Sequence, residues 1–338
     1  MKVVAIGGGT GLSTVLRGLK LYLREITYPS GPHAKISRLT AVVTVTDEGG
    51  SSGRLRREFR ILPPGDIRNC MVALAEDEKL LTQLFNYRFP TGRGLRGHSF
   101  GNLFLAALTH LTRDFAKAVR VSSEVLAIRG DIFPSTLSDV RLQAEQLDGN
   151  IIYGESRITK TRIPIKRLHI VPSHCRPLRE TLTALEQADL ITVGPGSLYT
   201  SLIPNLLVRG IPEQIARSRA LKVYICNLMT QPGESRGYSA VDHVRALHEH
   251  AGRKLFDVMI LNSRPVSSSL RRRYAADGAA PVVNDLAEVR ALGVLPVLAD
   301  VLVEDRVARH DSHRLAKLLL KLVESQESRD RELKELRS

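Results

Sequence analysis

The chain has 338 residues, of which 43% are hydrophobic and 25% charged, and this composition excludes a largely disordered or fibrous protein. Lys and Arg number 49 against 35 Asp and Glu, and the resulting charge of +14 favours anionic partners such as nucleic acid, a membrane surface or phosphorylated small molecules. Because Trp is absent and aromatic residues make up only 5%, stacking surfaces for nucleic-acid bases are disfavoured, and we expect no nucleic-acid partner.

The cysteines and the N-terminal residues bear on the compartment. Cys70, Cys175 and Cys226 lie far apart and form no CxxC motif, so we expect reduced packing cysteines rather than disulfides or a zinc site. Residues 1–7 are too short an apolar run for an export signal. No apolar run approaches the ~20 residues that span a bilayer. We therefore expect a cytoplasmic protein without a membrane span.

The first 45 residues predict a strand, a helix and a second strand. Residues 2–6 form a short β-branched run, and five residues with four glycines follow at 7–11. Residues 12–23 carry apolar side chains at helical spacing, and residues 39–45 are almost continuously apolar. This strand–helix–strand order implies a parallel sheet with a right-handed crossover.

The next segment departs from this order. Residues 47–53 are rich in Gly and Ser and predict an irregular loop, after which Asp66 is expected to cap a helix over 67–74. Helical patterns over 77–121 are interrupted by a Gly- and Arg-rich loop at 90–97. We therefore expect a helical insertion at about 54–121. Alternating apolar residues over 125–170 predict an antiparallel β excursion with a turn at 148–150.

Strands and helices alternate again after residue 177. Strands are expected at 190–193, 221–226, 258–261 and 294–298, and a last helix at 313–323. The charged residues 324–338 are expected to form a fraying tail. The fold class that follows is α/β: a Rossmann-like, three-layer α/β/α domain over 1–323, with a mainly parallel, doubly wound sheet and the two insertions.

Four polar loops directly follow predicted strands, at 7–11, 46–53, 194–197 and 227–233, and should open on one rim of the sheet. Glycine before a helix exposes backbone N–H groups that favour a phosphate. The first loop matches neither the dinucleotide fingerprint nor Walker A, so a tight turn without a ligand stays open. The candidate ligand-binding residues of the glycine-rich loops and of the fourth loop are Gly8, Gly9, Thr10, Gly11, Gly194, Gly196, Ser197 and Asn227.

The second loop and the segment after it add charged and hydroxyl groups. Asp47 is the candidate catalytic residue, as a base on a hydroxyl or as a ligand of Mg²⁺. Ser51, Ser52 and Asn102 are candidate ligand-binding residues. Arg54 suits a phosphate, although a solvated basic face is the alternative. His98 is a candidate general acid or phosphate donor, or a residue that only satisfies local hydrogen bonds, and Asp47, Asp66 and His98 together could form a divalent-metal site.

Six motifs in order along residues 1–323 resemble one family. They are VAIGGGTG (4–11), TDEGGSSGR (46–54), LPPGDIRN (62–69), GHSFGN (97–102), GPGSLY (194–199) and NLMTQPGE (227–234). Together they resemble the bacterial YvcK family of gluconeogenesis factors, relatives of 2-phospho-L-lactate transferase (CofD). The resemblance implies a Rossmann-like fold, a nucleotide-sugar ligand such as UDP-N-acetylglucosamine, and a role in cell shape and gluconeogenic growth.

The resemblance also implies roles for residues near the C-terminus. Tyr274 and Arg309 match the aromatic residue and the arginine that the family places at the ligand, and Ser312 falls where relatives carry a phosphorylatable Thr. Relatives usually show two aspartates before the glycine–serine run, whereas this chain has Asp47 and Glu48. The longer side chain of Glu48 changes the geometry with which a metal could be bound.

Two functions are therefore carried forward. The first is a cytoplasmic protein that binds a nucleotide sugar and regulates without turnover. The alternative is a Mg²⁺-dependent transferase that moves a phospholactyl-type group from a nucleotide diphosphate donor, with the cation neutralising the leaving group. No cofactor is required by the first function, and Mg²⁺ would serve the second. Assembly into a homo-oligomer stays open.

Overall fold

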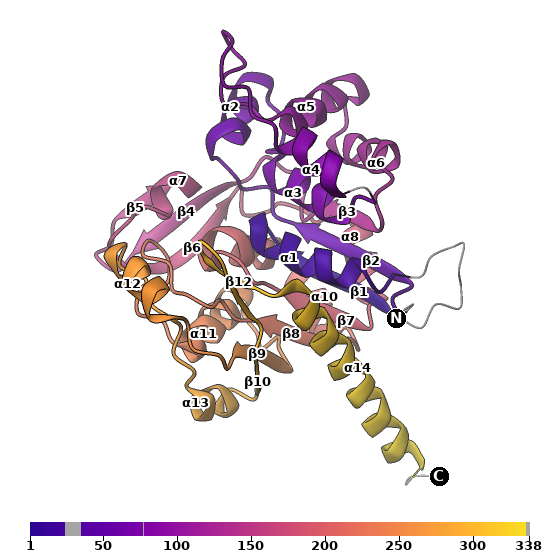
Figure 1. The fold of residues 1–338 in the computed structure, drawn as a ribbon, viewed down its shortest axis with the longest axis vertical. Coiled ribbons are helices and arrows are strands. Elements are labelled where there is room, and N and C mark those ends of the chain that lie inside the picture. Colours follow the sequence, from indigo (N-terminus) through magenta and orange to yellow (C-terminus); the bar gives the residue numbers. More distant parts are fainter. Residues whose placement is uncertain (24–34, 77, 336–338) are drawn as a thin grey trace.

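The computed structural model describes residues 1–23, 35–76 and 78–335, and is built on a sheet in which all neighbouring strands run parallel (Figure 1). From one edge to the other, the seven strands are β10 (Leu295–Ala299), β9 (Val258–Asn262), β8 (Leu221–Ile225), β7 (Leu190–Val193), β1 (Lys2–Gly7), β2 (Arg38–Val43) and β3 (Asp131–Pro134). The chain runs outward from β1 to β3 and then returns to β7 on the other side of β1. The predicted doubly wound sheet is confirmed.

Helices flank this sheet in a three-layer arrangement, as predicted. One group that packs together consists of α1 (Gly9–Lys20), α3 (Gly65–Leu74) and α14 (Ser312–Glu335). The other consists of α8 (Arg179–Glu186), α9 (Ile203–Leu207), α10 (Ile211–Arg217), α11 (Ala240–Ala251) and α13 (Leu286–Ala291). Because helices cover the sheet, the central strands are buried along nearly their whole length, which explains their continuous apolar runs.

The predicted helical insertion between β2 and β3 is confirmed. Besides α3 it contains α2 (Gly50–Phe59), α4 (Glu78–Asn86), α5 (Phe100–Thr112) and α6 (Phe115–Val125), and α2, α4, α5 and α6 stand above the sheet in Figure 1. The predicted antiparallel excursion is a three-stranded sheet with the strand order β5 (Ile151–Tyr153), β4 (Arg141–Gln146) and β6 (Ile165–Val171). The short helix α7 (Glu155–Ile158) lies between β5 and β6 along the chain. The predicted start of the excursion at 125 was wrong, because β3 pairs with β2 in the main sheet.

Small elements complete the chain near the carboxyl ends of the strands. A π-helical turn, η1 (Leu198–Leu202), follows β7, and α12 (Ser268–Ala276) follows β9. The strands β11 (Leu302–Glu304) and β12 (Ala308–His310) form an antiparallel hairpin between β10 and α14. Within the described residues, no helix is long and apolar enough to cross a membrane.

Two further expectations were wrong. The loop predicted over 47–53 ends at Gly49, since α2 begins at Gly50 and buries Ser51 and Ser52 in its first turn. Tertiary contacts override the poor helix propensity of Gly and Ser there: the buried Arg56 of the same helix is paired with Asp139.

The last helix, α14, does not end at 323 but continues through most of the expected tail to residue 335. This stretch is rich in residues with high helix propensity. Residues 336–338 lie outside the described part of the chain.

Candidate functional site

A cleft of about 980 Å³ opens at the carboxyl ends of β1, β7 and β8, where the strand order reverses. Each of the four predicted loops contributes residues to its lining, so their expected meeting on one rim is confirmed. Helices α3 and α4 contribute to the cleft, as do α12 and the β11–β12 hairpin. The cleft therefore lies between the helical insertion and the C-terminal hairpin.

The N-terminus of α1 opens into this cleft without a side-chain cap. Gly8 precedes the helix in an extended conformation, and the first backbone bond within the helix is donated by Leu12 to the Gly8 carbonyl. The amides before Leu12 therefore precede the helical hydrogen-bond ladder, and Gly9, Thr10 and Gly11 line the cleft. Such amides, together with the helix dipole, favour an anion such as phosphate.

The glycines of this loop are also required by packing. A Cβ on Gly8 would lie 2.5 Å from the Asp66 carboxylate, and a Cβ on Gly11 would collide with the carbonyl of Pro195. The two glycine loops that follow β1 and β7 are thereby held in direct contact. Glycine at these positions keeps α1 close to the second loop and to Asp66, whether or not a ligand is bound.

The second glycine loop differs from the first because its helical turn is already capped. The buried carboxylate of Glu234 accepts hydrogen bonds from the amides of Tyr199 (2.8 Å) and Thr200 (3.2 Å), and from the Thr200 hydroxyl (2.9 Å). The N-terminus of η1 thus binds an anion supplied by the protein itself. A phosphate is expected at α1 rather than at η1.

Other polar groups of the predicted loops bind one another. The Asn227 side chain donates to the Gly196 carbonyl (2.8 Å) and accepts from the Gly196 amide (3.1 Å). Gln231 donates to the Ser197 hydroxyl (2.8 Å). These bonds fix the loops after β7 and β8 to each other and hold the floor of the cleft rigid.

The carboxylates of Asp47, Asp66 and Glu155 lie close together near the N-terminus of α1. Burial and the neighbouring Asp47 raise the pKa of Asp66 to about 7, although a backbone hydrogen bond from Gly9 opposes the rise. Burial and Asp47 also raise the pKa of Glu155 to about 8, and Glu155 accepts the Glu48 amide at 2.8 Å. Near neutral pH this cluster therefore holds protons, and an anionic ligand meets less negative charge than three carboxylates would present.

The C-terminal hairpin also lines the cleft. The Tyr274 hydroxyl accepts the amide of Ala308 at 3.1 Å, which joins α12 to β12. Burial lowers the pKa of His310 to about 4, so its neutral ring donates from Nε2 to the Cys226 carbonyl at 3.1 Å. Arg309, between them, is exposed in the cleft, and its guanidinium has no hydrogen-bond or salt-bridge partner among the described residues.

Two thirds of the predicted site residues line this cleft. They are Gly8, Gly9, Thr10, Gly11, Asp47, Gly196, Ser197, Asn227, Tyr274 and Arg309. The remaining five do not line it: Ser51, Ser52, Arg54, Asn102 and Gly194. Instead, the first four connect α2 to the loop at 96–98 and to α5, while Gly194 has a positive φ of 82° and no room for a Cβ beside the Ile225 carbonyl.

The suggested metal site of Asp47, Asp66 and His98 is not assembled. His98 is buried and its Nδ1 lies 2.9 Å from the Ser51 hydroxyl, away from the carboxylates. Its pKa is lowered by burial and by the charge of Arg54, so the ring is neutral at pH 7. Across residues 1–23, 35–76 and 78–335, no group of three His, Cys, Asp or Glu residues could hold a metal ion.

Several residues of the cleft were not predicted as ligand-binding residues. Asp66 was expected to cap α3 and to join a possible metal site, but Pro64 occupies the cap position and Asp66 lies in the first helical turn and lines the cleft. Asn69 stands in the same sequence motif and could have been found with it. Glu155 and Asn86 reach the cleft from a β insertion and from α4, and no local pattern marks them.

Comparisons with known proteins agree on the family. The family model of 2-phospho-L-lactate transferase CofD matches residues 3–302. The gluconeogenesis factor of Bacillus subtilis is 47% identical over 324 residues, which are 95% of this chain and 98% of that protein. The gluconeogenesis factor of Halalkalibacterium halodurans is 48% identical over 320 residues, or 94% and 95% of the two chains.

A solved structure gives the same result. The crystal structure of a UPF0052 family member from Bacillus halodurans superposes with a TM-score of 0.87 at 47% identity, covering 95% of this chain and 100% of that one. The α/β fold predicted from the sequence is therefore also the fold of a crystallised relative that shares 47% sequence identity with this chain. The chain belongs to the CofD family, in the group of its members named gluconeogenesis factors.

Proposed function

We propose that the protein binds a nucleotide sugar of the UDP-N-acetylglucosamine type in the cleft and acts as a cytoplasmic regulator linked to gluconeogenic growth and cell shape. The observation that carries the proposal is the N-terminus of α1, which has no side-chain cap and lines, together with Arg309, a cleft large enough for such a ligand. The names of the relatives support the link to gluconeogenesis.

The diphosphate belongs at the start of α1 in this proposal. The amides of residues 10 and 11 supply donors, the helix dipole supplies partial positive charge, and Arg309 supplies a full charge. Asp66 and Glu155, with raised pKa values, hold protons near pH 7 and do not repel the diphosphate as ionised groups would. The amide side chains of Asn69 and Asn86 line the same cleft and suit sugar hydroxyls.

Isothermal titration with UDP-N-acetylglucosamine tests this proposal. Arg309→Ala should weaken binding by about 1.5–3 kcal/mol, the range for a hydrogen bond to a charged group, or roughly 10- to 150-fold. Arg306→Ala is the matched control, since Arg306 is exposed between the strands of the same hairpin and does not line the cleft. No heat at millimolar ligand, or equal losses in the two variants, would contradict the proposal.

A second candidate is the Mg²⁺-dependent transfer of a phospholactyl-type group from a nucleotide diphosphate donor. The observation that favours it, besides the family, is that Asp47 lines the cleft beside Asp66 and Glu155. Mg²⁺ is commonly bound by one or two carboxylates together with substrate phosphates, so Asp47 would suffice as the protein ligand. Release of GMP from such a donor, dependent on Mg²⁺ and lost in Asp47→Asn, is the expected result; equal rates in the two proteins would remove this candidate.

A further inference from the structure

A basic arm extends from the helical insertion and takes no part in the site described above. It consists of residues 87–98, which join α4 to α5 and begin directly after the cleft residue Asn86 (Figure 1). Residues 90–96 are exposed throughout, and none of the residues of the arm lines the cleft. The arm contains three arginines and no acidic residue, so it accounts for part of the net charge of +14.

Hydrogen bonds hold the arm in one hairpin-like conformation. The Phe89 amide donates to the His98 carbonyl at 3.0 Å, and the Gly97 amide donates to the Phe89 carbonyl at 2.8 Å. The rings of Tyr87 and Phe89 meet edge to face, with their centres 5.2 Å apart. The surface that the arm presents is therefore formed before any partner binds, which lowers the entropy cost of binding.

The charges of the arm are not neutralised by the protein. Arg93 and Arg96 are exposed near its tip, and neither they nor Arg88 forms a salt bridge with a described residue. On the adjacent helix α2, Arg54 donates to the Arg96 carbonyl at 2.7 Å, and the exposed Arg57 lies one turn further along that helix. The arm and this side of α2 therefore form one positively charged surface, which attracts anionic partners.

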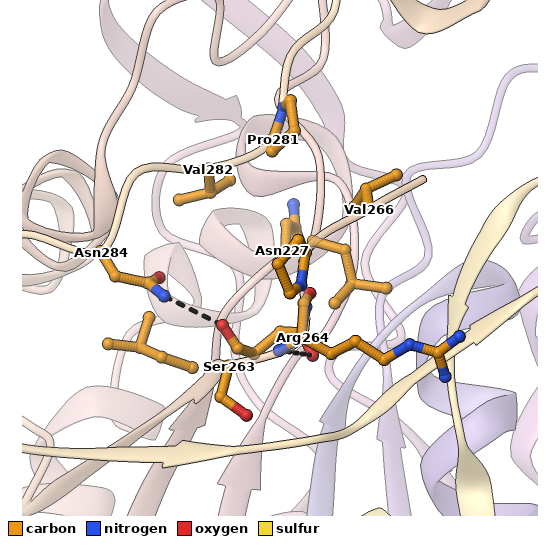
Figure 2. Close-up of a pocket in the computed structure, with 11 residues that line it drawn as sticks. Asn227, Ser263, Arg264, Val266, Pro281, Val282 and Asn284 are labelled. Carbon is orange, nitrogen blue, oxygen red and sulfur yellow. Dashed lines mark hydrogen bonds between the residues drawn. The ribbon is translucent and has the colours of Figure 1, made fainter. Parts of the chain in front are cut away.

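A second arginine cluster, at residues 271–273 of α12, has acidic neighbours. Glu304 accepts the Ser267 amide at 2.7 Å at the start of this helix, and Asp277 follows its end. Arg264 precedes the same helix and lines a cavity of about 150 Å³ that adjoins the cleft, and Figure 2 shows its guanidinium extending away from the other labelled residues. Acidic groups offset part of the charge of this cluster, so it provides a control for the arm.

Exposed apolar groups accompany the arginines of the arm. Leu95 stands between Arg93 and Arg96 and is 43% exposed, and Tyr87 at the base of the arm is 50% exposed. An aliphatic side chain adds nothing to the binding of nucleic-acid phosphates, but it is stabilised at the boundary between lipid headgroups and acyl chains. A Tyr ring, with an apolar body and a polar end, suits the same boundary. The combination favours an anionic bilayer over a nucleic acid.

We infer that the arm docks the protein on the surface of membranes that contain anionic lipids. Arg88, Arg93 and Arg96 contact the lipid phosphates, and Leu95 enters the boundary beneath the headgroups. Such binding needs no helix that crosses the bilayer. The inference goes beyond the proposed function and does not depend on a nucleotide sugar. Each arginine close to an anionic surface should raise the affinity roughly 5-fold.

Co-sedimentation of the full chain with lipid vesicles tests this inference. The unmodified protein should sediment with vesicles of equimolar phosphatidylglycerol and phosphatidylcholine, and not with vesicles of phosphatidylcholine alone. The double variant Arg93→Ala/Arg96→Ala should bind the anionic vesicles about 25-fold more weakly, because two arginines are lost. The control Arg271→Ala/Arg272→Ala removes the same charge from α12 and should weaken binding less than about 2-fold.

Leu95→Ala distinguishes a bilayer from other anionic partners. It should weaken binding to the anionic vesicles about 4- to 15-fold, because one or two CH₂ groups no longer enter the lipid. The matched control Leu147→Ala, at a position that is 64% exposed in the antiparallel insertion, should leave binding unchanged. All four positions of these variants in the arm and the insertion are exposed, and circular dichroism checks that the variants are folded.

Three results would overturn the inference. They are the absence of sedimentation of the unmodified protein with anionic vesicles, equal losses in the arm variants and their controls, and unchanged vesicle binding in Leu95→Ala. The last result, together with binding of RNA that is lost in Arg93→Ala/Arg96→Ala, would identify a nucleic acid as the partner instead. Titration with UDP-N-acetylglucosamine should give the same affinity for the arm variants and the unmodified protein, so failure of the inference leaves the proposed function standing.

Discussion

The replacement Asp66→Asn tests the account of the half-buried carboxylates of the cleft. Asp66 lies beneath the α1 N-terminus, where burial and the charge of Asp47 raise its pKa from 3.8 to about 7. The folded protein therefore holds a proton on Asp66 between about pH 4 and pH 7 that the unfolded chain releases. Stability contributed by this proton is fully present below pH 4 and is lost as the pH rises through 7. Asparagine has the same shape and never ionises.

The size of the effect follows from the pKa difference. One pH unit corresponds to about 1.36 kcal/mol, so a rise of roughly three gives at most about 4 kcal/mol. At pH 8 the Asp66→Asn protein should therefore be more stable than the unmodified protein, by about 1–4 kcal/mol once structural relaxation is allowed for. At pH 4 the two proteins should differ little, because Asp66 is neutral in the folded state and asparagine is neutral throughout.

Urea unfolding at pH 4.5, 6 and 8 measures this difference. Asp277→Asn is the control, since Asp277 is exposed at the end of α12 and its replacement removes the same formal charge without burial. Its effect should stay within about 0.5 kcal/mol at each pH. A stability difference for Asp66→Asn that does not grow with pH, or that has the opposite sign at pH 8, would refute the assigned pKa and its cause.

Three further predictions concern the same cleft. Gly11→Ala should lower the free energy of unfolding, measured in urea, by about 1–3 kcal/mol, because the added methyl group overpacks the contact with the second glycine loop. The control Gly50→Ala has open space around it and should lower this free energy by only about 1 kcal/mol, because of the positive φ of Gly50. Equal losses in the two variants would contradict the packing role of Gly11. Glu234→Ala should cost about 2–4 kcal/mol because buried amides lose their acceptor, and a loss below 0.5 kcal/mol would show that the capping is not needed. Without divalent cations, affinity for UDP-N-acetylglucosamine should fall between pH 6 and pH 9 as Asp66 and Glu155 ionise, and affinity independent of pH would remove their role.

The sequence predicts most of the fold because the relevant signals are local. Continuous apolar runs mark the buried strands, and their alternation with helical patterns fixes the parallel, doubly wound sheet. The errors arise where long-range contacts decide. The Gly–Ser run after Asp47 is helical from Gly50 onward because Arg56 is anchored at Asp139, which lies far along the chain. The short strand β3 joins the main sheet through pairing with β2, which no local pattern shows.

The site was predicted with the same limits. Residues that follow strands, such as Gly9 and Asn227, meet in the cleft because the ends of parallel strands share one rim. Glu155 comes from the antiparallel insertion, and its approach to Asp47 depends on the packing of two separate units. Conversely, Ser51 and Asn102 belong to recognisable motifs yet form internal hydrogen bonds, because a motif shows which residues are polar and not where they point.

The central claim is that a nucleotide diphosphate binds at the start of α1. A crystal structure of the protein with UDP-N-acetylglucosamine tests it most directly. The account predicts diphosphate oxygens within hydrogen-bond distance, about 2.7–3.2 Å, of the amides at residues 10 and 11, with the Arg309 guanidinium turned toward them. A ligand bound elsewhere, with the start of α1 facing only solvent, would contradict the claim.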